Sequence, residues 1–286
     1  MERFLIVLFL VCLSFGVHAQ SVESSPYPAK KSVMFEVNFK PFGKDEVISF
    51  KQLRGKYWIG NRTVLRLGFE YDSKTNESSE SLFDIAPRYK YSITENTALW
   101  GVSIGFEYRP LGSRKVSPYI GGDLTYRVKS SEALYESFTH FSEWDSSAET
   151  DRDVYRPDTY EVKNGWRSQS VEYCRDRNGW KVPEVVTDYD SERAFSAWGV
   201  ALVGGVDINV MKNVYLGVEI GLNHEIREFD KVEISHAYWE KKSYYSSYNS
   251  KVTVFTSKKE ESSRPSYSKG STKLYCNSAI RLGFWF

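Results

Sequence analysis

The chain has 286 residues, of which 41% are hydrophobic and 16% aromatic, and its formal net charge is +1 at pH 7. A charge this close to neutral argues against a nucleic-acid-binding surface, which normally carries a strong basic excess. The mean hydropathy of −0.47 argues against a bundle of transmembrane helices.

The N-terminus has the pattern of a secretory signal. An apolar run over 4–17 follows the single basic residue Arg3, and the small residues Val17 and Ala19 precede a cleavage site after Ala19. We therefore expect a signal peptide over 1–19. A membrane anchor is the alternative, but the run is shorter than the roughly 20 residues that a spanning helix needs. The polar segment 20–31 is expected to be a short periplasmic leader.

Eight segments in which apolar and polar residues alternate follow the leader. This period of two is typical of a strand with one apolar and one polar face. In the last segment, for example, Leu274, Ile280, Leu282, Phe284 and Phe286 share one parity. We expect strands at 33–40, 48–59, 63–72, 98–108, 116–128, 195–208, 214–225 and 272–286.

The connections alternate between short turns and longer segments. Two are long: 129–193 has 15 acidic and 9 basic residues, and 226–271 has 6 acidic and 9 basic. The segment 82–93 also alternates and is interpreted as an extension of the third and fourth strands, broken by Pro87; an additional strand is the alternative. With eight strands, both long segments fall on the extracellular side and the short turns on the periplasmic side, which fits the even strand number of bacterial barrels.

The two sets of alternating residues, one for each face of the strands, differ sharply in charge. One set is almost wholly aliphatic and aromatic. The other contains Glu36, Lys40, Arg54, Lys56, Arg66, Glu70, Glu107, Asp123, Arg127, Asp207, Glu219 and Arg281. So many charges do not suit an apolar ligand cavity, so the apolar parity is expected to face hydrocarbon. A soluble β-sandwich with one wet face is the alternative. The predicted fold is all-β: an eight-stranded antiparallel up-and-down transmembrane β-barrel with two long extracellular loops.

Further residues fit this interpretation. Aromatic side chains near the strand ends would form two interfacial girdles: Tyr71, Trp100, Tyr126 and Trp198 on one side, and Tyr57, Tyr108 and Phe286 on the other. Eight strands leave an interior that side chains can fill, so the inward charges should pair and plug the lumen. Glycines of the inward parity would allow close packing there; they are Gly105, Gly121, Gly205, Gly217 and Gly221.

Four blocks carry a family resemblance: S-P-Y-I-G-G-D-L (117–124), G-G-V-D-I (204–208), N-V-Y-L-G-V-E-I-G-L (213–222) and the terminal A-I-R-L-G-F-W-F. They resemble small outer-membrane β-barrel proteins of the Bacteroidota type, which are similar in architecture to the OmpX/OmpA group. The resemblance implies a cell outer membrane location and a barrel over 32–286. It also implies contact with outer-membrane lipid and lipopolysaccharide, and assembly by the barrel-assembly machinery through the strand ending in Phe286. It implies almost nothing about activity.

We therefore expect a monomeric, non-catalytic outer-membrane protein whose surface loops serve cell-surface interaction or envelope integrity. Opposite net charges on the two long segments, and an aromatic cluster in the second, favour recognition of a surface ligand. That cluster comprises Tyr238, Trp239, Tyr244, Tyr245, Tyr248 and Tyr267. Loops without a fixed partner, an enzyme acting on lipid A or peptides at the outer rim, and a narrow pore are the alternatives.

Candidate chemistry is sparse. General-base chemistry could involve His140 with Ser142 and Glu143, Asp151 with Asp153, or His224 with Glu225, but no spacing matches a barrel enzyme, so no catalytic or cofactor-binding residue is assigned. The acidic run Asp145, Glu149, Asp151 and Asp153 lacks the glycine and closing glutamate of a calcium loop, so no metal site is assigned. Cys174 and Cys276 could pair in an exported protein or remain free thiols.

Overall fold

The computed structural model describes residues 28, 31–39, 48–81, 90–145, 150–175, 181–245, 251–276 and 280–286. The expected signal peptide, nearly all of the expected leader, Lys40 and the segment 82–89 lie outside the described residues.

The described residues contain fourteen β-strands and no helix. The strands are β1 (Val33–Phe39), β2 (Ile48–Trp58), β3 (Thr63–Ser81), β4 (Lys90–Tyr108), β5 (Val116–Asp145), β6 (Thr150–Lys163), β7 (Trp166–Arg175), β8 (Lys181–Ser191), β9 (Phe195–Met211), β10 (Val214–Phe229), β11 (Val232–Tyr245), β12 (Lys251–Arg264), β13 (Tyr267–Cys276) and β14 (Ile280–Trp285). Within the described part of the chain, no helix is long and apolar enough to cross a membrane.

Twelve strands form one antiparallel sheet, and β7 and β8 form a separate hairpin. Strands β1 to β5 pair in sequence order. Strand β5 also pairs with β9, and β9 with β10. Strand β10 pairs with both β13 and β14, and β14 pairs with β1. Beyond these pairs, β6 joins β5, β11 joins β6, and β12 joins β11.

The all-β, antiparallel prediction is confirmed, and a strand lies at each of the eight predicted positions. The predicted closing strand 272–286 is divided between β13 and β14, which both pair with β10. Of the ambiguous segment, Lys90–Ile93 belongs to β4 and pairs with Ser78–Ser81 of β3, as an extension of those two strands would.

The prediction that 129–193 and 226–271 are loops is wrong. The first contains the end of β5 and all of β6, β7 and β8, and the second contains the end of β10, all of β11 and β12, and the first half of β13. Neighbouring strands satisfy their backbone hydrogen-bonding groups in pairs, so a strand needs no apolar face to be stable there. Serine-, threonine- and tyrosine-rich segments such as these therefore form long hairpins without a clear hydrophobic alternation.

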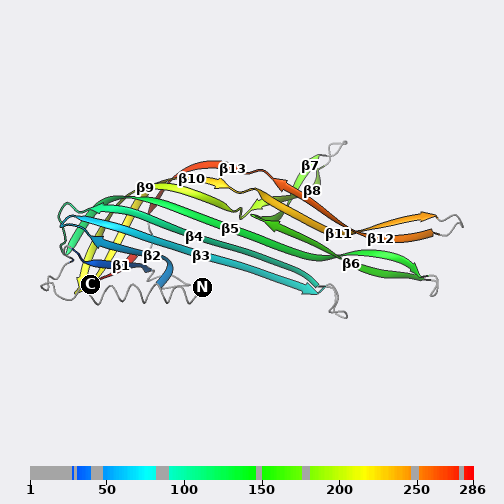
Figure 1. Cartoon of the computed structure of the whole chain (residues 1–286), viewed down its shortest axis with the longest axis horizontal. Coiled ribbons are helices and arrows are strands. Elements are labelled where there is room, and N and C mark those ends of the chain that lie inside the picture. Colours follow the sequence, from blue (N-terminus) through cyan, green and yellow to red (C-terminus); the bar gives the residue numbers. More distant parts are fainter. Residues whose placement is uncertain are drawn as a thin grey trace.

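The molecule is elongated. Figure 1 shows the short strands β1, β2 and β14 near one end, with the C-terminus, while β3, β4 and β5 continue far beyond them. The hairpins β5–β6 and β11–β12 reach the opposite end, and β7–β8 projects to one side. We call residues 130–145 of β5, together with β6, β11 and β12, the sheet extension.

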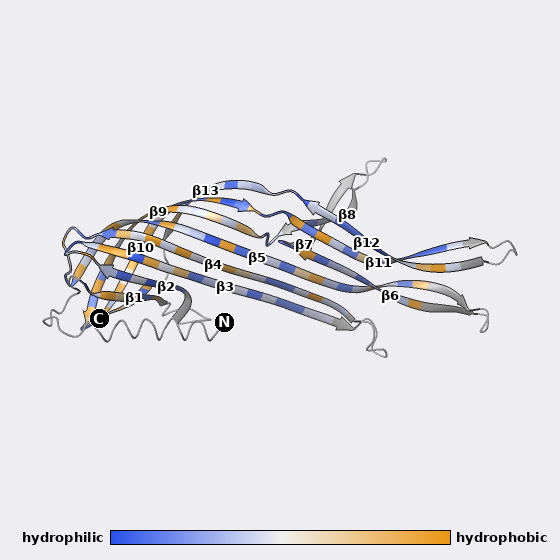
Figure 2. Ribbon diagram, viewed as in Figure 1, coloured by the Kyte–Doolittle hydropathy of each residue, from blue (hydrophilic) through white to orange (hydrophobic). Residues whose placement is uncertain are grey.

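Apolar residues gather at the end that contains β1, β2, β9 and β10 (Figure 2). Many of them face outwards there: Ile120 is 64% exposed and Leu202 66%, whereas Glu36 and Arg281 are each 1% exposed. Five others form a buried apolar cluster at the same end: Met34, Trp58, Val64, Tyr215 and Trp285. Charged side chains are almost never fully buried unless they are paired, so the buried charges must have partners inside. The sheet extension has a separate buried core formed by Ala133, Tyr135, Val162, Trp166, Val232 and Ile234.

Candidate functional site

The interior of the strand assembly holds a large buried ionic cluster. Its side chains come from β1, β2, β3, β4, β5, β9, β10 and β14, and from the residue that follows β4. It contains five cations and five anions: Arg54, Lys56, Arg66, Arg109, Arg281, Glu36, Glu107, Asp123, Asp207 and Glu219. The formal charges therefore cancel within what we call the ionic cluster.

Lys56 lies at its centre. The ammonium Nζ is 2.6 Å from Glu36 Oε1 and 2.7 Å from Glu107 Oε1, with an Asp207 oxygen at 3.6 Å. The Lys56 side chain is fully buried. One cation surrounded by three carboxylates requires further positive charge nearby, which the arginines supply.

Three of the four arginines bridge carboxylates from different strands. Arg281 Nη1 is 3.1 Å from Glu36 Oε2, and its Nη2 is 3.1 Å from Asp207 Oδ1. Arg109 Nη2 donates to Glu107 at 2.7 Å and to Asp207 at 2.5 Å. Arg66 reaches Glu107, Asp123 and Glu219, at 3.0–3.4 Å. These bridges tie opposite walls of the interior together.

Two buried tyrosines complete the network. The Tyr119 hydroxyl donates to Glu219 Oε2 at 2.8 Å and accepts from Arg281 Nη2 at 2.5 Å. The Tyr215 hydroxyl donates to Glu36 Oε1. Their rings fill the space that glycines leave: a Cβ on Gly205 would lie 2.3 Å from the Tyr119 hydroxyl oxygen, and one on Gly283 would lie 2.1 Å from the Tyr215 ring.

Close packing also explains two glycines of the inward parity. A Cβ on Gly105 would lie 2.0 Å from Asp123 Oδ1, and one on Gly217 would lie 2.4 Å from Asp207 Oδ1. Both distances are far below van der Waals contact, so the ionic cluster fits only because these two positions carry no side chain.

Most of the charges that the sequence predicts to face inwards are brought together in the ionic cluster. Lys40 is not described. Glu70 and Arg127 belong to a second network next to the cluster. In that network Arg127 Nη2 lies 3.3 Å from Glu225 Oε2, and Arg227 Nε donates to Glu225 Oε1 at 2.5 Å. Arg109, Tyr119 and Tyr215 were missed by the sequence prediction. The alternation of faces could have identified Arg109, because it lies two residues after Glu107 and four after Gly105, which both face inwards, although β4 ends at Tyr108.

The candidate catalytic residues do not form a described site. His224 is exposed and its Nδ1 lies 2.7 Å from Thr272 Oγ1, whereas Glu225 is buried among arginines. Successive residues of a strand point to opposite faces, so these two cannot work as a pair. His140 stacks near Tyr155, with ring centroids 5.1 Å apart, and the side chains of Ser142, Glu143, Asp151 and Asp153 lie outside the described part of the chain.

The metal and cysteine predictions remain untested. Among the described side chains, no group of three or more His, Cys, Asp or Glu residues could hold a metal ion. Glu149 and the side chains of Asp145, Asp151 and Asp153 are not described. Cys174 lies in β7 and Cys276 in β13, in different sheets, and neither side chain is described.

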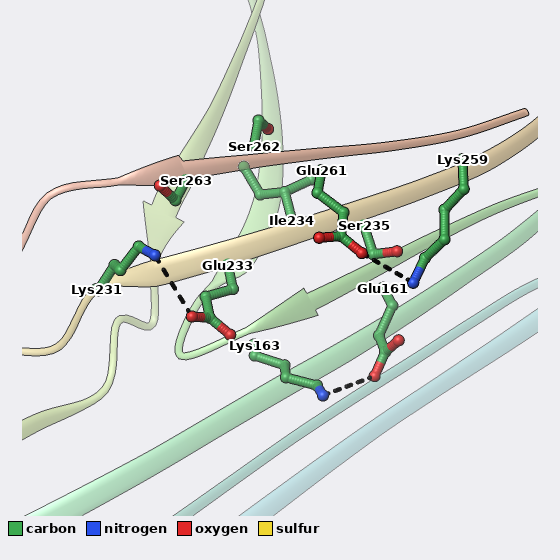
Figure 3. Close-up of a pocket in the computed structure, with 10 residues that line it drawn as sticks. All are labelled: Glu161, Lys163, Lys231, Glu233, Ile234, Ser235, Lys259, Glu261, Ser262 and Ser263. Carbon is green, nitrogen blue, oxygen red and sulfur yellow. Dashed lines mark ion pairs between the residues drawn. The ribbon is translucent and has the colours of Figure 1, made fainter.

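The sheet extension presents a charged groove on its surface, of about 290 Å³. Figure 3 shows three lysine–glutamate pairs along this groove. Glu161 and Lys163 lie on β6, Lys259 and Glu261 lie on β12, and Lys231, just before β11, pairs with Glu233 of β11. The N–O distances are 3.0–3.6 Å, and the charges cancel. Exposed pairs of this kind contribute about 0–1 kcal/mol each, so the groove is a zwitterionic surface and not a strong electrostatic site.

The base of the β7–β8 hairpin is fixed to the inner face of the sheet. The Tyr135 hydroxyl donates to Glu95 Oε1 at 2.8 Å and accepts from the Arg167 backbone N–H at 2.7 Å. Burial, with the nearby Glu95 carboxylate, raises the pKa of Tyr135, so its hydroxyl stays protonated at neutral pH and remains a donor. Trp166 Nε1 donates to the Asn96 carbonyl at 3.3 Å.

Comparison with known proteins gives no relative: no family model, no curated protein and no solved structure matches this chain.

Proposed function

We propose that the chain is an integral outer-membrane protein. In this proposal β1 to β5, β9 and β10 form an eight-stranded antiparallel transmembrane barrel, with β13 and β14 together as the eighth strand. The observation that carries it is the reversed polarity of the strands, with exposed aliphatic side chains outside and a neutral ionic cluster inside. Apolar surface of this extent is rarely left in water by a monomeric soluble protein, whereas hydrocarbon is its natural environment.

The aromatic residues support a bilayer of ordinary thickness around the strands. Trp100, Tyr126 and Trp198 lie on the neighbouring strands β4, β5 and β9, with successive ring centroids 5.9 and 4.5 Å apart. Tyr108 lies eight residues from Trp100 on β4 and is also exposed. Eight steps of about 3.4 Å, tilted by about 40°, give roughly 20 Å between the two levels, close to the apolar band of about 25 Å in such barrels.

The ionic cluster supports a filled lumen and not a diffusion pore. Its bridges cross the interior between strands that do not pair with each other, such as Lys56 of β2 with Asp207 of β9 and Arg66 of β3 with Glu219 of β10. A filled lumen leaves the sheet extension as the part that meets the surroundings of the cell. We therefore assign the protein a non-catalytic role in surface interaction or envelope integrity, carried by the β5–β6 and β11–β12 hairpins.

The C-terminal residue suits recognition by the barrel-assembly machinery. The Phe286 ring is 53% exposed on the apolar outside and lies 6.4 Å from the Phe35 ring, between centroids. The Phe286 backbone N–H donates to the Val33 carbonyl at 2.9 Å. A receptor for the strand end would therefore have to act before β14 pairs with β1.

Cysteine accessibility tests the orientation. In a Cys174→Ser, Cys276→Ser background, Ser257→Cys places a thiol on exposed β12, and Lys212→Cys places one in the exposed turn between β9 and β10. A membrane-impermeant maleimide added to whole cells should label the first variant only, and the second only after the outer membrane is permeabilised. Equal labelling of both in intact cells, or loss of the protein from membranes in a carbonate wash, would contradict the proposal.

A further inference from the structure

A cavity of about 320 Å³ lies above the ionic cluster, and we call it the vestibule. It is lined by side chains from β2, β3, β5, β9, β10 and β13: Gln52, Arg54, Glu70, Arg127, Ala201, Asn223, Glu225, Arg227, Ser271 and Lys273. Arg54 joins it to the ionic cluster, because its Nη1 lies 3.0 Å from Glu219 Oε1. The volume lies within the range of small-molecule sites.

The lining carries four cations and two carboxylates. One of the cations, Arg54, is balanced by Glu219 of the ionic cluster, and both carboxylates of the lining are matched by arginine. Glu225 receives Arg227 Nε at 2.5 Å and lies 3.3 Å from Arg127 Nη2. Glu70 lies 3.6 Å from Arg127 Nε. The two glutamates therefore hold the guanidinium groups in place, which lowers the entropy that a ligand would have to remove on binding.

Two lysines lie at the edge of the vestibule: Lys273, which is one of the four cations of the lining, and Lys269. Lys273 pairs in register with Asn223, and Lys269 pairs with Arg227, so both lie on the inward face of β13. Both are exposed, and neither forms an ion pair with a described residue within 4.0 Å. The Lys269–Arg227 pair places two like charges side by side, which is unfavourable, and the carboxylate that contacts Arg227, that of Glu225, is shared with Arg127.

We propose that the vestibule binds a compact anion bearing phosphate groups, with at least two negative charges. Planar guanidinium groups bind phosphate through paired hydrogen bonds, and lysines add point charges. An excess of positive charge in a cleft with low-dielectric walls concentrates such an anion, and here the excess comes from Lys273 and Lys269. The charged groove of the sheet extension serves as the contrast, because its three lysines are cancelled by three glutamates on the same strands. Anion binding by the vestibule depends on the fold and not on the membrane location, so either proposal can fail without the other.

Inorganic pyrophosphate is the probe. The full mature chain, folded in detergent micelles, is titrated by calorimetry with pyrophosphate, with citrate as a carboxylate of similar charge, and with glucose as a neutral solute. We expect saturable, salt-sensitive binding of pyrophosphate, weaker binding of citrate, and none of glucose. The Lys269→Gln, Lys273→Gln double variant should bind pyrophosphate about tenfold more weakly or worse, since charge-assisted bonds contribute about 1.5–3 kcal/mol.

The matched control is Lys231→Gln, Lys259→Gln, which removes two exposed lysines from the charged groove and should leave affinity unchanged. Protection of Lys273 from an amine-reactive ester, measured by mass spectrometry, gives a readout that does not depend on a variant. Absence of pyrophosphate binding, equal loss in both double variants, or unchanged modification of Lys273 at saturating pyrophosphate would overturn the proposal. Stronger binding of citrate than of pyrophosphate would overturn the assignment to phosphate.

Discussion

Replacing Arg281 by methionine tests whether the ionic cluster is a dry, balanced unit. The Arg281 guanidinium lies within 3.4 Å of oxygens of Glu36, Asp207 and Glu219, and its side chain is 1% exposed. Methionine keeps a similar length of apolar chain without the charge. The substitution leaves four cations facing five carboxylates, and the side chains of those five carboxylates are at most 10% exposed.

Breaking one partner out of a buried ion pair destabilises a protein by about 3–5 kcal/mol, because the remaining charge is left without compensation. We expect Arg281→Met to lower the free energy of unfolding by an amount in that range. Adding Asp207→Asn restores neutrality, since it removes one of the carboxylates that Arg281 contacts. The double variant should therefore recover at least about 1 kcal/mol relative to the single one, a non-additive result typical of residues that share one network.

The free energy of unfolding is measured by urea titration of the protein folded in lipid vesicles, followed by tryptophan fluorescence. Lys259→Met is the control, because its 3.0 Å pair with Glu261 lies on the exposed sheet extension and should contribute less than about 1 kcal/mol. If Arg281→Met changes the free energy of unfolding no more than the control does, the interior charges are hydrated and the argument for a filled lumen fails.

Three further variants test other parts of the structure. Gly105→Ala should cost about 1–3 kcal/mol, measured by the same titration, because its Cβ would lie 2.0 Å from the facing aspartate; Gly60→Ala, with nothing within 4 Å, should be silent. Leu202→Arg should make insertion into vesicles less favourable by about 2–4 kcal/mol if Leu202 lies at the bilayer midplane. Val254→Arg on the sheet extension should change the free energy of insertion by no more than about 0.5 kcal/mol. Equal effects of the two substitutions would count against a lipid-facing Leu202. Tyr135→Phe removes a hydroxyl bonded to a glutamate and a backbone N–H of β7 and should cost about 1–2 kcal/mol, seen as faster proteolysis of the β7–β8 hairpin; unchanged cleavage would show that these bonds do not hold the hairpin.

Much of the strand assembly could be predicted from the sequence because one physical rule governs it. Where a strand separates two media, its side chains must alternate, and the alternation places strands at positions such as 63–72 and 214–225. The inward charges follow from the same alternation, so the sequence alone places Glu36, Arg66 and Arg281 on one face. Which carboxylate pairs with which cation depends on strand stagger, and the alternation carries no information about that.

The sheet extension was missed for a different reason. Strands β6, β11 and β12 have solvent near much of their surface, so little in their residue types distinguishes them from loops. Their stability comes from backbone pairing along whole hairpins and from the small core around Trp166, which gathers residues from β5, β6, β7 and β11. Such a core depends on contacts between residues as distant as Ala133 and Ile234, and one sequence read locally does not reveal them.

Strand β5 shows where the proposed membrane must end. Along its first half the inward residues are polar, with Asp123 and Arg127, while the outward Ile120 and Leu124 are exposed. Past Ser131 the same inward face becomes apolar and buried, at Ala133 and Tyr135, while the outward face gains exposed glutamates at 132 and 136, on either side of the exposed Leu134. A strand in one medium throughout would have no reason to exchange the polarity of its two faces. In the proposed barrel, hydrocarbon would surround the first half of β5 and water the second, which would account for the exchange. The proposal then places the outer boundary of the apolar belt near residues 129–131, just beyond Tyr126.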